Sequence, residues 1–374
     1  MAGEVAARIL TDFSEIGRLW KDTDAIHGAP QSLEWIDNWR TIVNADSFVA
    51  GLFDGSGPIL LVPLEVVLQN GAKIARYPGG SHANCNFPWL RKEYDVIRSC
   101  DAVNQMVSLI RKVRPDIDAL SLTRQLSELQ GVANPLLALG KAPNPNPVLA
   151  ASLDDGFDAV LDRAHRKRKL KKHRQHGRRY EESGGWRIAG PHSRAESDKV
   201  LDLYFAMKAQ RFQKMGISDP FADENVRNFF KSFFGDGLTK GQELNELRFL
   251  EVGGATRSII GKVFGVAGPT VEFGAIAEDE LMTASPGEFL FFEDISRSCE
   301  EGRSVYSFGI GDEPYKREWC DVEFTIYDTL VPLSAKGKLF TTLQSARNTV
   351  AGNLKRNPRL WGLVKALRSR FAKR

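Results

Sequence analysis

Two segments of this chain concentrate cationic side chains and contain no acidic residue. Residues 163–179 hold ten Lys and Arg side chains, and residues 334–374 hold eleven. The rest of the chain holds 30 basic and 47 acidic residues, so an acidic body carries two basic segments. Because charge is this local, we expect contacts with phosphates or lipid headgroups at these two segments rather than a general nucleic-acid coat, and no DNA partner.

The first basic segment presents like charges four residues apart, which destabilises an isolated helix. An anion is therefore expected to contact part of it: a nucleotide-linked substrate, lipid headgroups or RNA. A solvated helix end balanced by the acidic body is the alternative. His165, His173 and His176 lie within the segment, but their spacings of eight and three, without nearby carboxylates, make a poor metal site. No metal is expected.

Several function classes are disfavoured by what the sequence does not contain. There is no GxxxxGK[ST] phosphate loop, and no GxGxxG stands between a strand and a helix, so ATP hydrolysis and nicotinamide chemistry have no support. Its four cysteines form no CxxC pair, which argues against a zinc ribbon or a disulfide framework. Residues 1–16 are too charged for a secretory signal, and no apolar run is long enough to span a bilayer. We expect a cytoplasmic protein.

The elements that would position a site begin with a block ending near residue 147. Apolar residues recur at helical spacing over 33–43, whereas 48–53 and 59–67 have the pattern of strands joined by a turn at 54–57. Alternating prolines in 141–148 predict an extended linker and a domain boundary. The block is expected to be an α/β unit.

The second block shows helical patterns over 157–179 and 198–214, followed by strand patterns over 247–252, 259–266 and 271–276. A further helix is expected to begin with a capping box formed by Ser285 and Glu288, with Pro286 at its first position, and to end at Gly302. Strands over 304–308 and 322–330 close the block. The expected fold class is α/β, with mixed, mostly antiparallel sheets flanked by helices.

The tail after residue 332 has a composition of its own. In 358–374 apolar residues repeat on one helical face opposite basic ones. This pattern is typical of a helix that lies on an anionic membrane surface, so we expect a peripheral contact there, at the inner membrane surface. Docking of the helix on the domain body is the alternative.

Two short motifs carry a family resemblance. They are the run from Ser285 through Pro, Gly, Glu and Phe to Leu290, and the run Phe308-Gly-Ile-Gly-Asp-Glu-Pro-Tyr-Lys316, followed by Trp319. They resemble the CelD/BcsL-type GNAT acetyltransferases, a family associated with bacterial cellulose and exopolysaccharide production. One position departs from the family pattern, because Ser307 stands where an acidic residue is expected.

The resemblance covers about residues 10–332 and implies two GNAT-like units in tandem, related to FemAB-type peptidoglycan aminoacyltransferases. The domains expected are 1–147, a GNAT-like unit, 148–332, the acyltransferase unit, and 333–374, a basic helical tail.

The resemblance also implies catalytic residues. Attack on a thioester carbonyl creates an oxyanion, which needs a donor or a positive charge at about 3 Å. Lys316 is the candidate for this role, and Tyr315, with an ordinary pKa near 10, is the candidate to protonate the departing thiolate. Glu313 or Glu272 could accept the proton of the nucleophile. A surface lysine, a packing tyrosine and exposed glutamates are the alternatives.

The implied co-substrate is acetyl-CoA or another acyl-CoA. Its pyrophosphate would lie at the start of the helix that begins near residue 285, where free N–H groups favour anions, and its 3′-phosphate could contact the first basic segment. Glu288, if it folds back as a cap, would oppose this, and a purely structural helix cap is the alternative. The residues expected to bind the co-substrate are Ser285, Gly287, Gly309, Gly311, Arg166 and Arg178.

The function expected is transfer of an acyl group, with acetyl preferred, from acyl-CoA to an amine or hydroxyl of a cell-envelope or exopolysaccharide precursor, either a small molecule or a glycan precursor. A FemAB-like transferase that uses aminoacyl-tRNA is one alternative, for which tRNA would be the partner. A non-catalytic partner of a polysaccharide synthase complex is the other.

Overall fold

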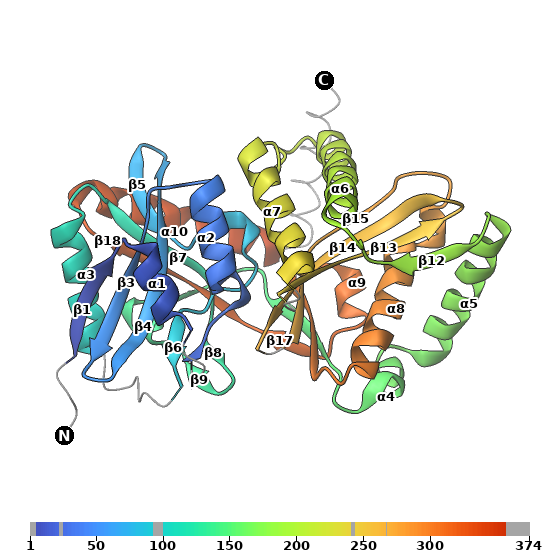
Figure 1. Cartoon of the computed structure of the whole chain (residues 1–374), viewed down its shortest axis with the longest axis horizontal. Coiled ribbons are helices and arrows are strands. Elements are labelled where there is room, and N and C mark those ends of the chain that lie inside the picture. Colours follow the sequence, from blue (N-terminus) through green and yellow to red (C-terminus); the bar gives the residue numbers. More distant parts are fainter. Residues whose placement is uncertain (1–4, 22–24, 93–99, 241–243, 267, 357–374) are drawn as a thin grey trace. The chain divides into compact units, whose positions relative to one another are not determined.

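The computed structural model describes residues 5–21, 25–92, 100–240, 244–266 and 268–356. The chain divides into two compact units, coloured by sequence in Figure 1. Among the described residues, unit 1 contains the chain up to Pro147 and the segment 325–356, and unit 2 contains Val148–Phe324. The boundary expected at residues 147 and 148 coincides with the end of the first segment of unit 1.

Unit 1 is built on a mixed sheet whose central hairpin matches the sequence expectation. Strands β3 (Ser47–Asp54) and β4 (Gly57–Gln69) pair antiparallel around a tight turn, and α2 (Leu33–Ile42) forms where the helical spacing predicted it. The remaining strands and α-helices of the first segment are β1 (Ala6–Leu10), α1 (Phe13–Leu19), β2 (Ala25–Ile26), β5 (Ala72–Arg76), β6 (Trp89–Arg91), α3 (Cys100–Val113), β7 (Ala119–Leu126), β8 (Glu128–Leu129), β9 (Val132–Ala133) and β10 (Ala142–Pro143).

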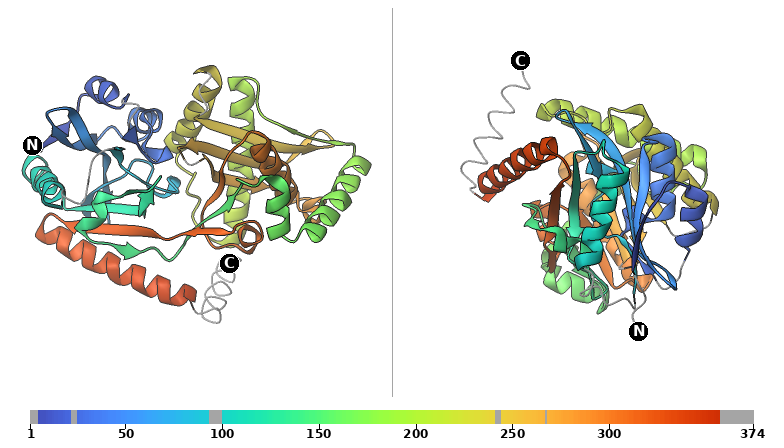
Figure 2. Two further views of the ribbon diagram at one scale, coloured as in Figure 1. Left: turned by 90° about the horizontal axis from the view of Figure 1, so that it is seen from below. Right: turned by 90° about the vertical axis from the view of Figure 1, so that its left-hand side faces the viewer.

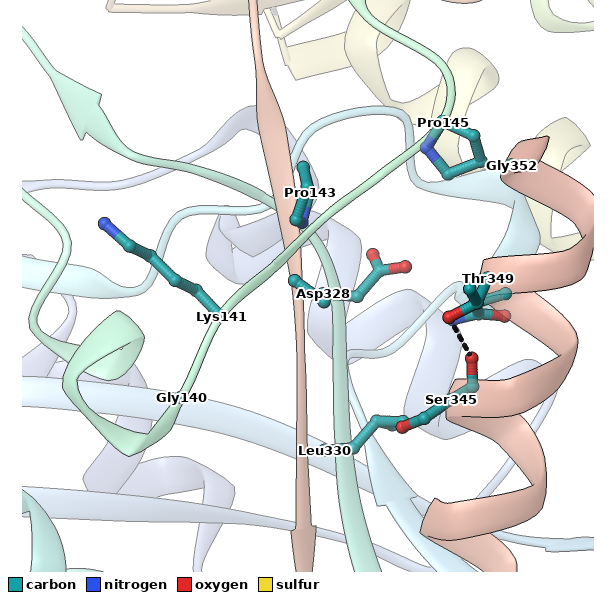
Figure 3. A pocket seen from close by; sticks show the side chains of 11 residues that line it. Gly140, Lys141, Pro143, Pro145, Asp328, Leu330, Ser345, Thr349 and Gly352 are labelled. Atoms are coloured by element: carbon teal, nitrogen blue, oxygen red, sulfur yellow. Dashed lines mark hydrogen bonds between the residues drawn. The ribbon is translucent and has the colours of Figure 1, made fainter. Parts of the chain in front are cut away.

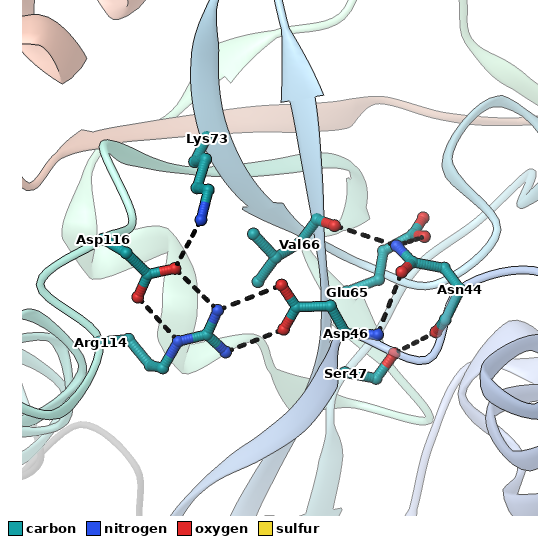
Figure 4. A network of polar contacts seen from close by, with 8 residues as sticks. All are labelled: Asn44, Asp46, Ser47, Glu65, Val66, Lys73, Arg114 and Asp116. Carbon is teal, nitrogen blue, oxygen red and sulfur yellow. Dashed lines mark hydrogen bonds and ion pairs between the residues drawn. The ribbon is translucent and has the colours of Figure 1, made fainter.

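A polar network ties the strand ends of unit 1 together (Figure 4). The buried carboxylate of Glu65 accepts a hydrogen bond from Asn44 at 3.0 Å, so this charge is not left without a partner inside the unit. Arg114 bridges Asp46 and Asp116, and its hydrogen bonds hold the pKa of Asp116 below its ordinary value. These charged residues therefore have a structural role, because each one is paired within unit 1.

Unit 2 contains a second sheet, whose strands follow the order β12-β13-β14-β15-β16-β11-β17. The helix expected over 157–179 is broken in two at His165, whose φ of 64° is left-handed. The elements of unit 2 are β11 (Val148–Ser152), α4 (Gly156–Arg163), α5 (Arg166–Glu182), β12 (Trp186–Ala189), α6 (Arg194–Met215), α7 (Glu224–Lys240), β13 (Asn245–Val252), β14 (Ala255–Gly265), β15 (Gly268–Ile276), α8 (Pro286–Glu300), β16 (Val305–Ile310), α9 (Pro314–Arg317) and β17 (Val322–Phe324).

Helices cover both faces of the unit 2 sheet (Figure 1). On one face the ring of Phe273 from β15 contacts Tyr204 of α6 and Phe230 of α7, at centroid distances of 4.4 and 5.5 Å. On the other face Val271, also from β15, packs into the apolar cluster that contains Leu290 of α8. Each helix layer therefore buries its own side of the same strand.

The strand expected over 322–330 is two strands in different sheets. β17 pairs with β11 in unit 2, whereas β18 (Ile326–Pro332) pairs antiparallel with β7 in unit 1. An alternating apolar pattern does not say to which sheet a strand adds, which is why the sequence interpretation was wrong here. The last strand expected in the second block, β18, therefore belongs to unit 1.

Helix α10 (Ala335–Arg356) follows β18 and packs on unit 1 (Figure 2), so the described part of the expected tail is docked on the domain. A Cβ on Gly337 would lie 1.7 Å from the carbonyl oxygen of Asp118, which shows how closely the helix approaches the sheet. The segment 358–374, for which a membrane contact is expected, lies outside the described residues. No helix among the residues the structure describes is long and apolar enough to cross a bilayer.

Candidate active site

Among the described pairings of the unit 2 sheet, one strand pair is parallel, and a β-bulge lies beside it. β15 and β16 share a single register pair, Thr270 with Ser307. On its other edge β15 pairs Phe273 with Gly261 but Val271 with Lys262, so Glu272 is the extra residue of a β-bulge. Bulges disrupt the local ladder and re-aim side chains, and they are frequent next to active sites.

Lys316 lies just past the end of β16, on the short helix α9. Its side chain points inward, and the residue is only 6% exposed. The Nζ donates a hydrogen bond to the Ile310 carbonyl oxygen at 2.8 Å and lies 3.0 Å from a carboxylate oxygen of Glu313. Among the described residues, these two contacts use two of the three N–H donors of the ammonium, which leaves one for a ligand.

Gly309 and Gly311 shape the turn that brings Lys316 to the strand end. Both have a positive φ, 68° and 132°, which residues with a side chain seldom adopt. A Cβ on Gly311 would lie 2.9 Å from the Lys316 Nζ and 2.4 Å from an oxygen of Glu313. The glycine is therefore required by both backbone conformation and space.

Tyr315 and Glu313 lie beside Lys316 on α9. The Tyr315 ring stacks on Phe291 of α8 at a centroid distance of 5.8 Å and lies edge-on to Phe308 of β16. This partial burial raises the pKa of Tyr315 above its ordinary value, so the phenol keeps its proton at neutral pH but is a weaker acid than an exposed tyrosine. The Glu313 side chain is half-exposed.

Two cations of α6 act on this group and were missed by sequence reasoning. The positive charge of Arg211 lowers the pKa of Tyr315 and so opposes the rise caused by burial. Burial is the main cause that lowers the pKa of Lys208, and the negative charge of Glu313 partly offsets it. Tyr204, Lys208 and Arg211 follow the i, i+4, i+7 spacing of one helix face, and Tyr204 is fully buried. That spacing was the signal available in the sequence.

The start of α8 differs from the expected capping box. Ser285 has a left-handed φ of 51°, and its side chain makes no capping hydrogen bond. Glu288 instead binds the buried ammonium of Lys169 at 2.8 Å, because that charge needs an anionic partner. Pro286 occupies the first helical position as expected. The Glu288 carboxylate therefore does not fold back over the first amides of α8.

Gly287 allows α8 to approach the sheet, since a Cβ there would lie 2.9 Å from a methyl carbon of Ile276 at the end of β15. The loop before α8 is held by α5. Arg179 donates to Thr283 Oγ1 at 2.8 Å and to the Glu280 carbonyl oxygen at 2.9 Å, and the Tyr180 hydroxyl donates to the Ala284 carbonyl oxygen at 2.6 Å. The first turn of α8 and the basic helix are thus fastened together.

A basic hollow of about 580 Å³ lies on this part of α5, beside the loop before α8. Burial lowers the pKa of His176, one of its lining residues, below the ordinary value. Arg178 lines the hollow as well, and its location next to the loop before α8 suits a phosphate. The lining residues are Lys171, Arg174, Gln175, His176, Arg178, Arg179, Glu182 and Thr283.

The N-terminal half of α5 is occupied by internal contacts. Arg166 pairs with Asp158 at 2.7 Å and with Asp162 at 2.5 Å, both on α4. It stands twelve residues before Arg178, which is about 18 Å along a helix axis, so these two expected phosphate ligands cannot hold one phosphate. Lys169 lies 4.0 Å over the ring of Trp319. Arg166 and Lys169, two of the cations at the start of this helix, are therefore paired within the protein.

Glu272, an expected base, and His173, one of the three histidines of the first basic segment, remain to be placed. The His173 ring stacks between Phe289 and Phe292 of α8, at 4.3 and 4.0 Å, and its Nε2 lies 2.6 Å from Glu293. It therefore serves packing. Among the residues that the structure describes, no three or more His, Cys, Asp or Glu side chains are grouped to hold a metal ion. Glu272 occupies the bulge of β15, whereas Glu313, the other expected base, follows β16.

A buried ion network that the sequence analysis did not anticipate lies between the sheet and α8. Asp294 is fully buried and accepts from Lys262 at 2.8 Å and from the Tyr306 hydroxyl at 2.7 Å. Glu246 completes the pairing of Lys262 at 2.9 Å. Both charges of the central pair are compensated, so the network belongs to the structural core of unit 2.

Comparison with known proteins identifies the fold. The family model of the acetyltransferase (GNAT) domain matches residues 166–317, which contain α5, the β15–β16 pair, the start of α8 and α9. The crystal structure of FemX is similar with a TM-score of 0.57 and 11% identity, covering 88% of this chain and 97% of that one. No curated protein sequence matches the chain.

Two further solved structures are similar over the same share of the chain. The C-terminal domain of a putative lysylphosphatidylglycerol synthetase from Agrobacterium fabrum has a TM-score of 0.50 and 13% identity, and covers 88% of this chain and 94% of that domain. A conserved protein of unknown function from Bacteroides thetaiotaomicron has a TM-score of 0.53 and 12% identity, and covers 88% of this chain and 99% of that one. The fold is thus α/β and GNAT-like, in tandem, as the resemblance implied.

Proposed function

We propose that unit 2 transfers an acyl group, with acetyl preferred, from acyl-CoA to an amine or hydroxyl acceptor. One observation carries this proposal, and it lies within the residues that the GNAT domain model matches. The bulged strand β15, which has a single register pair with β16, lies in the same sheet as the end of β16, where the ammonium of Lys316 points inward. Beyond Thr270 and Ser307, the facing strand edges offer backbone groups to an extended pantetheine chain.

The phosphates of the donor would lie at the start of α8 and in the basic hollow of α5. The first amides of α8 near Gly287 are suited to an anion, and the Glu288 carboxylate is turned to Lys169 instead of to these amides. Arg178, Lys171 and Arg174 add positive charge beside the loop that precedes the helix. In this assignment Ser285, in its left-handed conformation, sets the direction in which α8 begins.

The chemical step follows from the α9 residues. The acceptor nitrogen or oxygen attacks the thioester carbonyl, and the free N–H of Lys316 stabilises the oxyanion. Glu313 or Glu272 takes the acceptor proton, the C–S bond breaks, and Tyr315 gives its proton to the CoA thiolate. The charge of Glu313 is felt at Lys208 of α6, and the charge of Arg211 is felt at Tyr315, and positive charge there suits an acceptor that carries an anionic group. We place the acceptor among cell-envelope or exopolysaccharide precursors of the CelD/BcsL kind.

Acyl-CoA binding is tested by the melting temperature of the purified protein with acetyl-CoA, together with native mass spectrometry for a retained ligand. A rise that is weakened by Arg178→Gln and Lys171→Gln but not by Lys199→Gln, an exposed lysine of α6, is expected. No shift at millimolar acetyl-CoA would count against the proposal.

A second candidate is favoured by the exposed basic residues of α5. A transferase that takes its acyl group from aminoacyl-tRNA would use Lys171, Arg174 and Arg178 on the tRNA backbone. Its signature is tRNA binding whose affinity falls steeply with salt and that the same substitutions weaken. Failure of acetyl-CoA to bind, combined with such tRNA binding, would select this alternative.

A further inference from the structure

The outward face of α10 carries an unexpected row of apolar side chains. Leu339, Leu343 and Val350 are 62%, 53% and 58% exposed, and their spacing of four and seven residues places them along one stripe. Exposed single leucines are common, but a contiguous stripe on one helix marks an interaction surface. This stripe lies in described residues, ahead of the segment 358–374.

The stripe faces outward because the opposite side of α10 is anchored on unit 1. Ser334 donates to Asp118 at 2.6 Å and accepts from the Gly337 amide at 3.0 Å, which fixes the start of the helix. Phe340 packs with Ala72, Ile74 and Ala119. A hollow of about 410 Å³ is lined by the second half of α10 and by Lys141, Pro143 and Asp328 (Figure 3). The helix therefore lies along the surface of unit 1.

Charge indicates what covers the stripe. Arg347 falls on the same helix face as the stripe, and Lys336 lies beside it with its ammonium 3.7 Å from Asp118 of unit 1. No acidic residue occurs from 334 to the end of the chain. A second copy of the chain docked by this face would oppose like charges without a carboxylate to pair them, and the basic segment 358–374 meets the same objection. The basic face of α5, by contrast, exposes no large apolar residue among those described.

We propose that α10 docks on an anionic lipid surface, with its apolar stripe in the interface and its basic residues on the headgroups. A helix that combines apolar and basic side chains on one exposed face lies in the plane of such an interface. This assigns a membrane contact to residues 336–350. It is independent of the transfer chemistry, which resides in unit 2.

Vesicle sedimentation of the full chain tests the proposal. Binding is expected to vesicles that contain phosphatidylglycerol and not to vesicles of phosphatidylcholine alone. Leu339→Gln with Leu343→Gln should weaken binding at least about tenfold, since both leucines would leave the interface. Arg347→Gln should weaken it about fivefold. Glutamine has a helix propensity close to that of leucine, so α10 should persist.

The matched control is Leu68→Gln, which removes a leucine that is even more exposed (74%) from β4 of the same unit and should leave binding unchanged. Melting temperature and acetyl-CoA binding should be the same in all variants, which separates this proposal from the proposed function. The proposal is overturned if the double variant binds like the wild type, if phosphatidylcholine vesicles bind equally well, or if the substitutions abolish self-association instead.

Discussion

Replacing Lys316 by methionine separates catalysis from packing more sharply than other substitutions in α9. Methionine keeps an unbranched side chain of similar length but removes the ammonium that lies 2.8 Å from the Ile310 carbonyl oxygen. Loss of one oxyanion donor lowers turnover by about 10²–10³, or about 2.7–4 kcal/mol. We therefore expect turnover to fall by that factor while the dissociation constant of acetyl-CoA stays nearly the same.

The stability cost of the same change is smaller. The Ile310 carbonyl oxygen loses one hydrogen bond, which costs about 1–3 kcal/mol. The partner carboxylate of Glu313 is half-exposed, so the ion pair adds at most about 1 kcal/mol. A variant that still shows one cooperative urea transition at assay temperature is therefore expected.

The assay follows thiol release from acetyl-CoA with an acceptor fraction that supports turnover by the wild type, and calorimetry gives the dissociation constant. Arg317→Gln is the control, because it removes the neighbouring α9 cation, which is exposed and paired with Asp312 and Glu323. Wild-type turnover in Lys316→Met would refute the oxyanion role and leave the lysine as a latch for the turn.

Three further predictions concern the framework of unit 2. Gly311→Ala should cost about 1–3 kcal/mol of unfolding free energy and reduce turnover, because φ is 132° and the new methyl group would meet Lys316. The control is Gly302→Ala, where φ is 71° and the space around the glycine is open. It should cost about 1 kcal/mol and leave turnover intact. Burial lowers the pKa of His176 below 6.5, so its contribution to unfolding free energy should fall as pH drops below 6.5, and His176→Gln should remove that part of the acid sensitivity in urea titrations. Asp294→Ala would leave the Lys262 ammonium buried without this partner, which we expect to cost about 3–5 kcal/mol, measured by the urea midpoint; a loss below 1 kcal/mol would contradict the assignment of a compensated buried pair.

The elements of the fold were predictable where a local pattern determined them. The hairpin of β3 and β4 and the strands β13 to β15 follow from apolar stretches bounded by glycine turns, and these predictions are confirmed. The sheet to which β18 adds depends on long-range pairing with β7, which no local pattern encodes. The same reason explains why α10 was expected to belong to a separate tail.

The candidate site was predictable to a different extent. The motif around Lys316 could be found because glycines, proline and charged residues lie close together in the sequence. The prediction of a capping box at Ser285 was wrong, because Glu288 forms an ion pair with Lys169, which lies more than a hundred residues away in the sequence. Arg166 and Arg178 were equivalent by charge alone, and only the ion pairs of Arg166 with α4 tell them apart. Tertiary partners decide such cases, and one sequence does not show them.

A crystal structure with acetyl-CoA bound tests the central claim most directly. The account predicts the pantetheine chain between the edges of β15 and β16 and the thioester carbonyl oxygen about 3 Å from the Lys316 Nζ. Acetyl-CoA bound elsewhere on the chain, or a carbonyl oxygen beyond hydrogen-bonding distance of Lys316, would contradict it.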